Sequence, residues 1–156
     1  MSDSGELFDQ GYFQRQGTAL EPLETERAAS IVYRLKSSIV VGRARGYVDA
    51  PHMQHLIEYC DAVLREVDCI TVFHDWFAVT GYESRTRQVM TPWAVRTRAR
   101  HAAIHIGVTS QVVRMGIAVV SLASGAPIET HGSPSSHLAA LAGAMRPSSA
   151  LPPSGR

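Results

Sequence analysis

The sequence lacks the patterns that identify most small enzymes and metalloproteins. It contains no glycine-rich phosphate loop, no HExxH helix and no GxSxG nucleophile turn. Its two cysteines, Cys60 and Cys69, have no CxxC spacing, so neither a disulfide framework nor a zinc site is predicted. Both cysteines lie in apolar stretches, which favours buried, reduced thiols. We therefore expect no metal and no cofactor.

Long apolar runs are also absent. A membrane-spanning helix needs roughly 18 consecutive apolar residues. The longest apolar segment, 112–123, is interrupted by Arg114 and Ser121. The N-terminus is acidic and polar and has no apolar region typical of a signal peptide. We therefore expect no membrane span and a cytoplasmic location.

Acidic residues are almost missing from the second half of the chain. Residues 84–156 contain one acid, Glu129, and 8 arginines, whereas residues 1–83 contain 13 acids and 7 basic residues. Such an asymmetry can indicate an anionic or nucleic-acid partner. No aromatic-plus-basic RNA motif accompanies it, so we favour neutralisation between the two halves and expect no nucleic-acid partner.

Strand and helix patterns alternate along most of the chain. Strands are predicted at 31–35, 39–46, 69–73, 102–108 and 127–131, and helices at 50–66, 84–100, 111–124 and 137–145. A short polar link makes the first two strands an antiparallel hairpin. The later alternation predicts an α/β fold, with a mixed, mostly parallel five-stranded sheet flanked by about four helices.

The chain length favours one domain with flanking segments. Its 156 residues are 45% hydrophobic, which is enough for one core. We assign residues 1–30 to an N-terminal arm, 31–145 to the α/β domain and 146–156 to a disordered, Pro/Ser/Gly-rich tail. The predicted helix 111–124 is apolar nearly all round, so it is either deeply buried or covered by a partner, which makes it a candidate for self-association.

The segment Ile70–Arg85 is the strongest candidate site. Its apolar strand ends at His74–Asp75, a predicted aromatic loop follows, and a helix begins near Ser84. Open α/β sheets place their sites at such carboxyl ends of strands. The aromatic residues of the loop are equally compatible with interface anchors and with packing against the first helix; they are Trp76, Phe77 and Tyr82.

The start of the predicted helix offers two interpretations. Ser84 there could hold a phosphate near the helix N–H donors, but a simple N-cap is the favoured interpretation. Arg85 and Arg87 could bind an anion, but ion pairs with Glu83 and Asp75 are the more common use of such residues.

Histidine spacing gives little support for catalysis or metal binding. His74 and Asp75 are adjacent on a strand and should point to opposite faces, so they do not form a dyad. His101 and His105 should share a strand face about 13 Å apart, too far for one metal ion.

The best metal geometry in the sequence is a row on the first predicted helix. His52, His55 and Glu58 share one face of that helix. An exposed polar face is the favoured explanation for this row.

The element order and the Asp75–Thr86 segment resemble the STAS domain family, which includes bacterial anti-sigma-factor antagonists and SpoIIAA-like domains. In that family an Asp ends the central strand, and Asp-Ser-Ser/Thr-Gly opens the next helix eight residues later. Here Asp75 is followed eight residues later by Glu83, and then by Ser84, Arg85 and Thr86. The resemblance covers about residues 31–145 and includes IGVTSQVVRMGIAVVSLASGAPIETH, which is similar to the family's final strand-helix-strand.

The resemblance implies a non-enzymatic protein–protein interaction module in bacterial signalling or regulation. Arg85 occupies the position of the family's phospho-acceptor, so the chain is more similar to the divergent SpoIIAA-like group. The implied partner is a protein such as a kinase or an anti-sigma-like regulator. The residues expected to contact it are Asp75, Trp76, Tyr82, Glu83, Ser84, Arg85 and Arg87.

Two other hypotheses come from different classes of function. The first is a binder of a small apolar ligand or lipid, held between the helices and the sheet as the resemblance to SpoIIAA-like domains implies. An apolar cavity would support it. The second is an enzyme that uses His74, Asp75 and Arg85, which would require titratable groups to converge in a cleft.

Overall fold

The computed structural model describes residues 18–19 and 22–147, so most of the predicted arm and of the predicted tail lies outside the described residues. The elements, in chain order, are β1 (Thr18–Ala19), β2 (Leu23–Glu24), β3 (Ala28–Arg34), β4 (Ile39–Val48), α2 (Ala50–Leu64), β5 (Ile70–Tyr82), α3 (Ser84–Thr97), the 3₁₀ turn η2 (Arg98–Arg100), β6 (His101–Gly107), α4 (Gln111–Ser124), β7 (Ile128–His131) and α5 (Pro134–Met145).

The strands form one mixed sheet in the order β1-β3-β4-β5-β6-β7, and β2 also pairs with β3. β3 and β4 form the predicted antiparallel hairpin, and β4 to β7 run parallel. The predicted α/β fold class is confirmed. The five predicted strands correspond to β3–β7, and the two-residue strands β1 and β2 are additional antiparallel pairings on β3.

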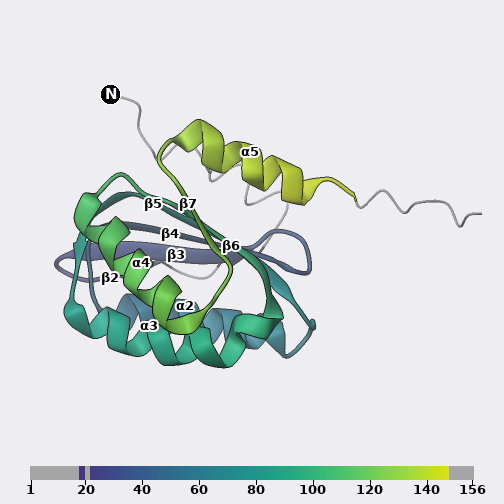
Figure 1. The fold of residues 1–156 in the computed structure, drawn as a ribbon, viewed down its shortest axis with the longest axis horizontal. Helices are drawn as coiled ribbons and strands as arrows, with labels where there is room; N and C mark the ends of the chain where they lie inside the picture. Colours follow the sequence, from purple (N-terminus) through teal and green to yellow (C-terminus); the bar gives the residue numbers. More distant parts are fainter. Residues whose placement is uncertain (1–17, 20–21, 148–156) are drawn as a thin grey trace, which may run out of the picture.

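Helices cover both faces of the sheet. α2, α3 and α4 lie on one face, and α5 lies on the other (Figure 1). Successive strand residues alternate between two cores: Val72 belongs to the larger core beneath α2–α4, and Phe73 to the smaller core beneath α5. A strand buried on both faces has no polar alternation, which explains the continuous apolar run in the sequence.

Strand β5 is longer than the sequence predicted. The expected loop 75–81 is wrong, because β5 continues to Tyr82 beside β4. The pairing passes two irregularities, after Arg43 and after Gly46, and these insert extra residues into β5 without ending the ladder. Polar and glycine residues that suggested a loop therefore lie within a bulged strand.

The helix boundaries largely agree with the sequence patterns. Ser110 caps α4 by accepting from the Val113 N–H at 3.4 Å, and Gly125 ends that helix at φ +67°. Pro92 lies inside α3, which runs as one helix from Ser84 to Thr97. In the part of the chain that the structure describes, no helix has the length and apolar content needed to cross a membrane.

Two burial predictions are corrected by the structure. Cys60 is buried as expected, but Cys69 is exposed because it precedes the first buried residue of β5. His52 is buried rather than solvent-facing, with its Nδ1 2.6 Å from Ser30 Oγ. Glu58 is exposed and accepts from the Gln54 side chain, so the helix row does not converge.

Gly46 provides a test of the β3–β4 hairpin. It has φ +85°, and a Cβ there would overlap the carbonyl oxygen of Arg27. We expect Gly46→Ala to reduce the free energy of unfolding by about 2 kcal/mol or more, measured by urea denaturation. The control is Gly143→Ala in α5, where a Cβ meets no atom within 4 Å. That control should be neutral or slightly stabilising, and equal losses in both variants would contradict the account.

Candidate functional site

The aromatic residues of the candidate segment belong to the domain body. Trp76 and Tyr82 are half-buried and pack against the larger core. The Trp76 ring lies 4.7 Å from the His74 ring, measured between centroids. Phe77 points to the other face, where its ring meets His137 edge-on at 5.8 Å. The structure therefore favours packing over exposed interface anchors for these side chains.

His74 and Asp75 lie on opposite faces of β5. Asp75 pairs with Arg43, its register partner on β4, with 3.4 Å between Oδ2 and Nε. Burial raises the pKa of Asp75, while the Arg43 guanidinium and the Phe77 N–H oppose that shift. This carboxylate is held in a structural ion pair and does not meet His74, as strand alternation predicts.

The start of α3 is tied to α2 through Glu83. Glu83 Oε2 accepts from the Ala50 N–H at 3.2 Å, and Glu83 rather than Ser84 occupies the N-cap position. Ser84 is the first helical residue and is exposed, as is Arg85. Among the described residues, neither Arg85 nor Arg87 forms the predicted ion pair with Glu83 or with Asp75.

A cavity lies between the sheet and the helices α2, α3 and α4. Its volume is about 80 Å³, and most of its lining is apolar. Trp76, Tyr82 and Arg87, three of the predicted site residues, contribute to its wall. The candidate segment therefore contributes side chains to the wall of this cavity, and its aromatic residues do not form an exposed loop surface.

Three polar atoms without hydrogen-bond partners belong to residues of this cavity wall: Nδ1 of His74, Nε2 of His101 and Nε of Arg87. Burial lowers the pKa of His74 to about 3, and the nearby His137 and His101 act in the same direction. Burial also lowers the pKa of His101, although its Nδ1–H donates to the Thr97 carbonyl at 2.9 Å. Both imidazoles are thus neutral near pH 7 and can exchange hydrogen bonds with a polar ligand group.

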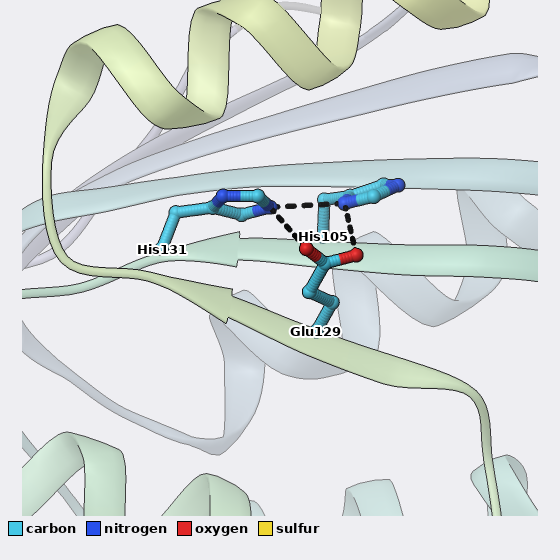
Figure 2. A group of neighbouring side chains, drawn as sticks. All are labelled: His105, Glu129 and His131. Carbon is cyan, nitrogen blue, oxygen red and sulfur yellow. Dashed lines mark hydrogen bonds and ion pairs between the residues drawn. The ribbon is translucent and has the colours of Figure 1, made fainter.

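A second cluster lies on the opposite face of the sheet. His105 on β6 meets Glu129 and His131 on β7, with all candidate ligand atoms within 4.8 Å of one another (Figure 2). The His105 Nδ1 is 3.0 Å from the His131 Nε2 and 3.6 Å from a Glu129 carboxylate oxygen. Burial lowers the pKa of His105, while the Glu129 charge opposes that shift. Two imidazoles and a carboxylate are the donor types that hold transition metals.

The sequence pattern did not predict this cluster. His105 was compared with His101 on its own strand, and both were expected on one face. A register shift between Ile70 and Thr71 leaves Ala102 unpaired, so His101 faces the cavity while His105 stacks on Phe73 at 4.7 Å. The detectable signal was Glu129-x-His131, whose period of two places both side chains on one face of the neighbouring strand.

Comparison with solved structures finds an uncharacterised DUF3478-family protein from Shewanella loihica PV-4, described as having a SpoIIAA-like fold. The TM-score is 0.56 at 10% sequence identity, over 78% of this chain and 99% of that chain. This chain has a SpoIIAA-like fold. The fold resemblance inferred from the sequence is confirmed, but a likeness at this identity carries no function with it. No protein-family profile and no curated protein matches the sequence.

The buried neutral His74 predicts a specific acid sensitivity. Its pKa is about 3 in the folded SpoIIAA-like domain and 6.5 as a free side chain. The unfolded chain therefore gains a proton below about pH 6.5 that the folded chain does not bind. Stability is lost as the pH falls from there towards the folded pKa, at about 1.4 kcal/mol per pH unit for this residue.

We expect His74→Gln to flatten that slope, because glutamine does not titrate. The measurement is the urea-derived free energy of unfolding at a series of pH values between 7 and 4.5, for both proteins. Parallel pH profiles would show that His74 is not kept neutral by the fold. The comparison uses slopes, so a constant loss of stability in the variant does not affect the result.

Proposed function

We propose that this protein is a non-enzymatic interaction module that pairs with a second copy of itself through the outer face of α4. The observation that supports this is an exposed apolar stripe. Its four side chains are 48–88% exposed: Val112, Met115, Val119 and Leu122. The opposite side of α4, including Val113 and Ile117, is buried against the domain. The apolar side chains of the outer face therefore do not belong to the core of this chain.

The spacing of the stripe matches a helix–helix seam. Its residues follow each other at intervals of three, four and three, which is the a/d pattern of paired helices. A two-fold axis brings the same patch of both copies together, so the patch must be self-complementary. Arg114 is the one charged residue of α4, and it is half-buried and donates to the Val108 carbonyl. An uncharged stripe produces no like-charge repulsion between two copies.

The size of the stripe is compatible with a stable pair. Fully burying an exposed side chain of this kind contributes about 1.5–3 kcal/mol. The stripe side chains are already partly buried, so each contributes only the fraction still exposed, 48–88% of that amount. Eight such side chains across two copies reach the range of the roughly 4–15 kcal/mol cost of association. The dimer would also bind a further protein partner in a regulatory role. The SpoIIAA-like fold and the resemblance of the Asp75–Thr86 segment to the STAS family support this part of the proposal.

Leu122→Lys tests the α4 pairing. The wild-type chain should sediment as a dimer at micromolar concentrations, and the variant as a monomer, because an ammonium group would be buried in the seam. Leu138→Lys is the matched control, since Leu138 is 44% exposed on α5. A monomeric wild type at high micromolar concentration, or a variant that remains dimeric, would contradict the proposal.

A second candidate function is supported by the cavity. Its volume of about 80 Å³ is roughly half that of an apolar protein cavity of about 150 Å³ that admits benzene or xenon. The unpartnered Arg87 and His74 nitrogens would suit a ligand with a small apolar body and one polar or anionic group. The inner side of α4 lines the cavity through Val113 and Ile117, so binding there and pairing through the outer side would involve one helix.

Xenon is a suitable probe of this cavity. We expect dissolved xenon to shift the methyl NMR signals of Ile104 and Val113, both of which line the cavity. Ala94→Leu should weaken these shifts because it fills the cavity, whereas Ala139→Leu on exposed α5 surface should not. Shifts that are absent from the wild type, or unchanged in Ala94→Leu, would rule out the cavity as a binding site.

A further inference from the structure

The parallel pairing of β6 and β7 brings three potential metal ligands to one face of the sheet. His105 and Glu129 are direct register partners, and His131 lies two residues beyond Glu129 on the same side of β7. Figure 2 shows the two imidazole rings and the carboxylate pointing towards one another. The cluster is on the α5 face of the sheet, so it is separate from the cavity and from the α4 stripe.

The distances fit a single small ion. Donor atoms bound to one tetrahedral ion at about 2.0–2.1 Å lie roughly 3.3 Å apart. Here the His105 Nδ1 and the His131 Nε2 are 3.0 Å apart, and the Glu129 oxygens are 3.6 Å and 3.9 Å from these two nitrogens. The two Glu129 distances belong to different carboxylate oxygens, and one donor atom from each residue lies within 4.8 Å of the others. A rotation of the exposed Glu129 side chain that brings one oxygen towards both nitrogens would complete the site.

Neighbouring groups orient both imidazoles. The His131 Nδ1 is 2.8 Å from the Ser136 hydroxyl, which leaves the Nε2 directed at the cluster. The His105 ring is stacked on Phe73 at 10° between planes. His131 is also flanked by the fully buried His137 ring, at 5.5 Å between centroids. A hydrogen bond to the second imidazole nitrogen is the usual support of a metal-binding histidine.

Access and charge also favour an ion. The Glu129 side chain is 67% exposed, whereas those of His105 and His131 are 14% and 5% exposed, so the site opens to solvent on the carboxylate side. Glu129 is the one acid after Glu83 in the sequence. Among the described residues, its two carboxylate oxygens lie 3.6 Å from the His105 Nδ1 and 3.9 Å from the His131 Nε2, so the carboxylate faces both imidazoles.

We propose that His105, Glu129 and His131 bind one divalent transition-metal ion of the zinc class, with a fourth coordination position open to solvent. Two imidazoles and one carboxylate suit Zn²⁺ or Co²⁺ and are poor ligands for Mg²⁺ or Ca²⁺, which prefer oxygen donors alone. Three protein ligands with an open position distinguish this site from a closed structural zinc site. Ser136 is a positioning residue that acts through His131.

The test is zinc titration of the full, untagged and metal-stripped chain by calorimetry, with Co²⁺ absorption as a second readout. We expect one equivalent to bind, and Co²⁺ to give the visible bands of a low-coordinate site. Glu129→Gln should weaken binding at least about 10-fold without affecting the fold, because this side chain is exposed. His131→Gln should abolish binding, and Ser136→Ala should weaken it about 10-fold.

The matched control is His55→Gln, which removes a half-buried histidine on α2, remote from the cluster. It should bind zinc as the wild type does. The proposal is overturned if the wild-type chain binds no zinc, or if Glu129→Gln and His131→Gln both bind as tightly as the wild type. Binding of several equivalents that persists in both variants would indicate surface adsorption and would also overturn it.

Discussion

The burial of β5 on both of its faces is the constraint on which the rest of this structure depends. Because side chains alternate along a strand, successive residues of β5 point to opposite faces of the sheet and into different cores. Val72, His74 and Trp76 face the cavity beneath α2–α4, while Phe73 and Phe77 face α5. One strand therefore supplies the floor of the cavity and supports the histidine cluster on the opposite face.

This arrangement places three features in different parts of the molecule: the cavity, the α4 stripe and the histidine cluster. The cavity lies between the sheet and the layer of α2, α3 and α4, and the α4 stripe lies on the outer side of that layer. The histidine cluster lies on the opposite face of the sheet, beneath α5. Figure 1 shows α5 on the other side of the sheet from α2, α3 and α4. α4 connects the first two, since its inner side lines the cavity and its outer side is exposed. The histidine cluster depends on the register of β6 and β7. It does not involve the outer face of α4.

The sequence was sufficient for the fold because its signals were local and consistent. The helical spacing in 50–66, the Ser110 cap and the Gly125 end each fix one element, and the alternation of elements fixes a mostly parallel sheet. The SpoIIAA-like fold follows from that order. The extension of β5 past Asp75 was missed because pairing with β4, a non-local interaction, overrides the local turn signals.

The candidate sites were predictable only in part, for the same reason. His74, Trp76 and Arg87 were identified as a segment, but whether they face solvent or a cavity depends on helices packed from elsewhere in the chain. The approach of His105 to His131 depends on strand register, and the separation of His101 from His105 depends on one unpaired residue. A shift of one residue reverses the face of every side chain that follows, and no composition pattern reveals it.

The central claim is that the sheet separates two independent sites, and an amide NMR spectrum of the full chain with one equivalent of zinc tests it most directly. The account predicts shifted signals at the ends of β6 and β7 and at the start of α5, including His105, His131 and Ser136. Signals of the cavity residues Val113 and Ile117 should stay in place. Equal shifts on both faces of the sheet, or shifts confined to the cavity, would contradict the separation.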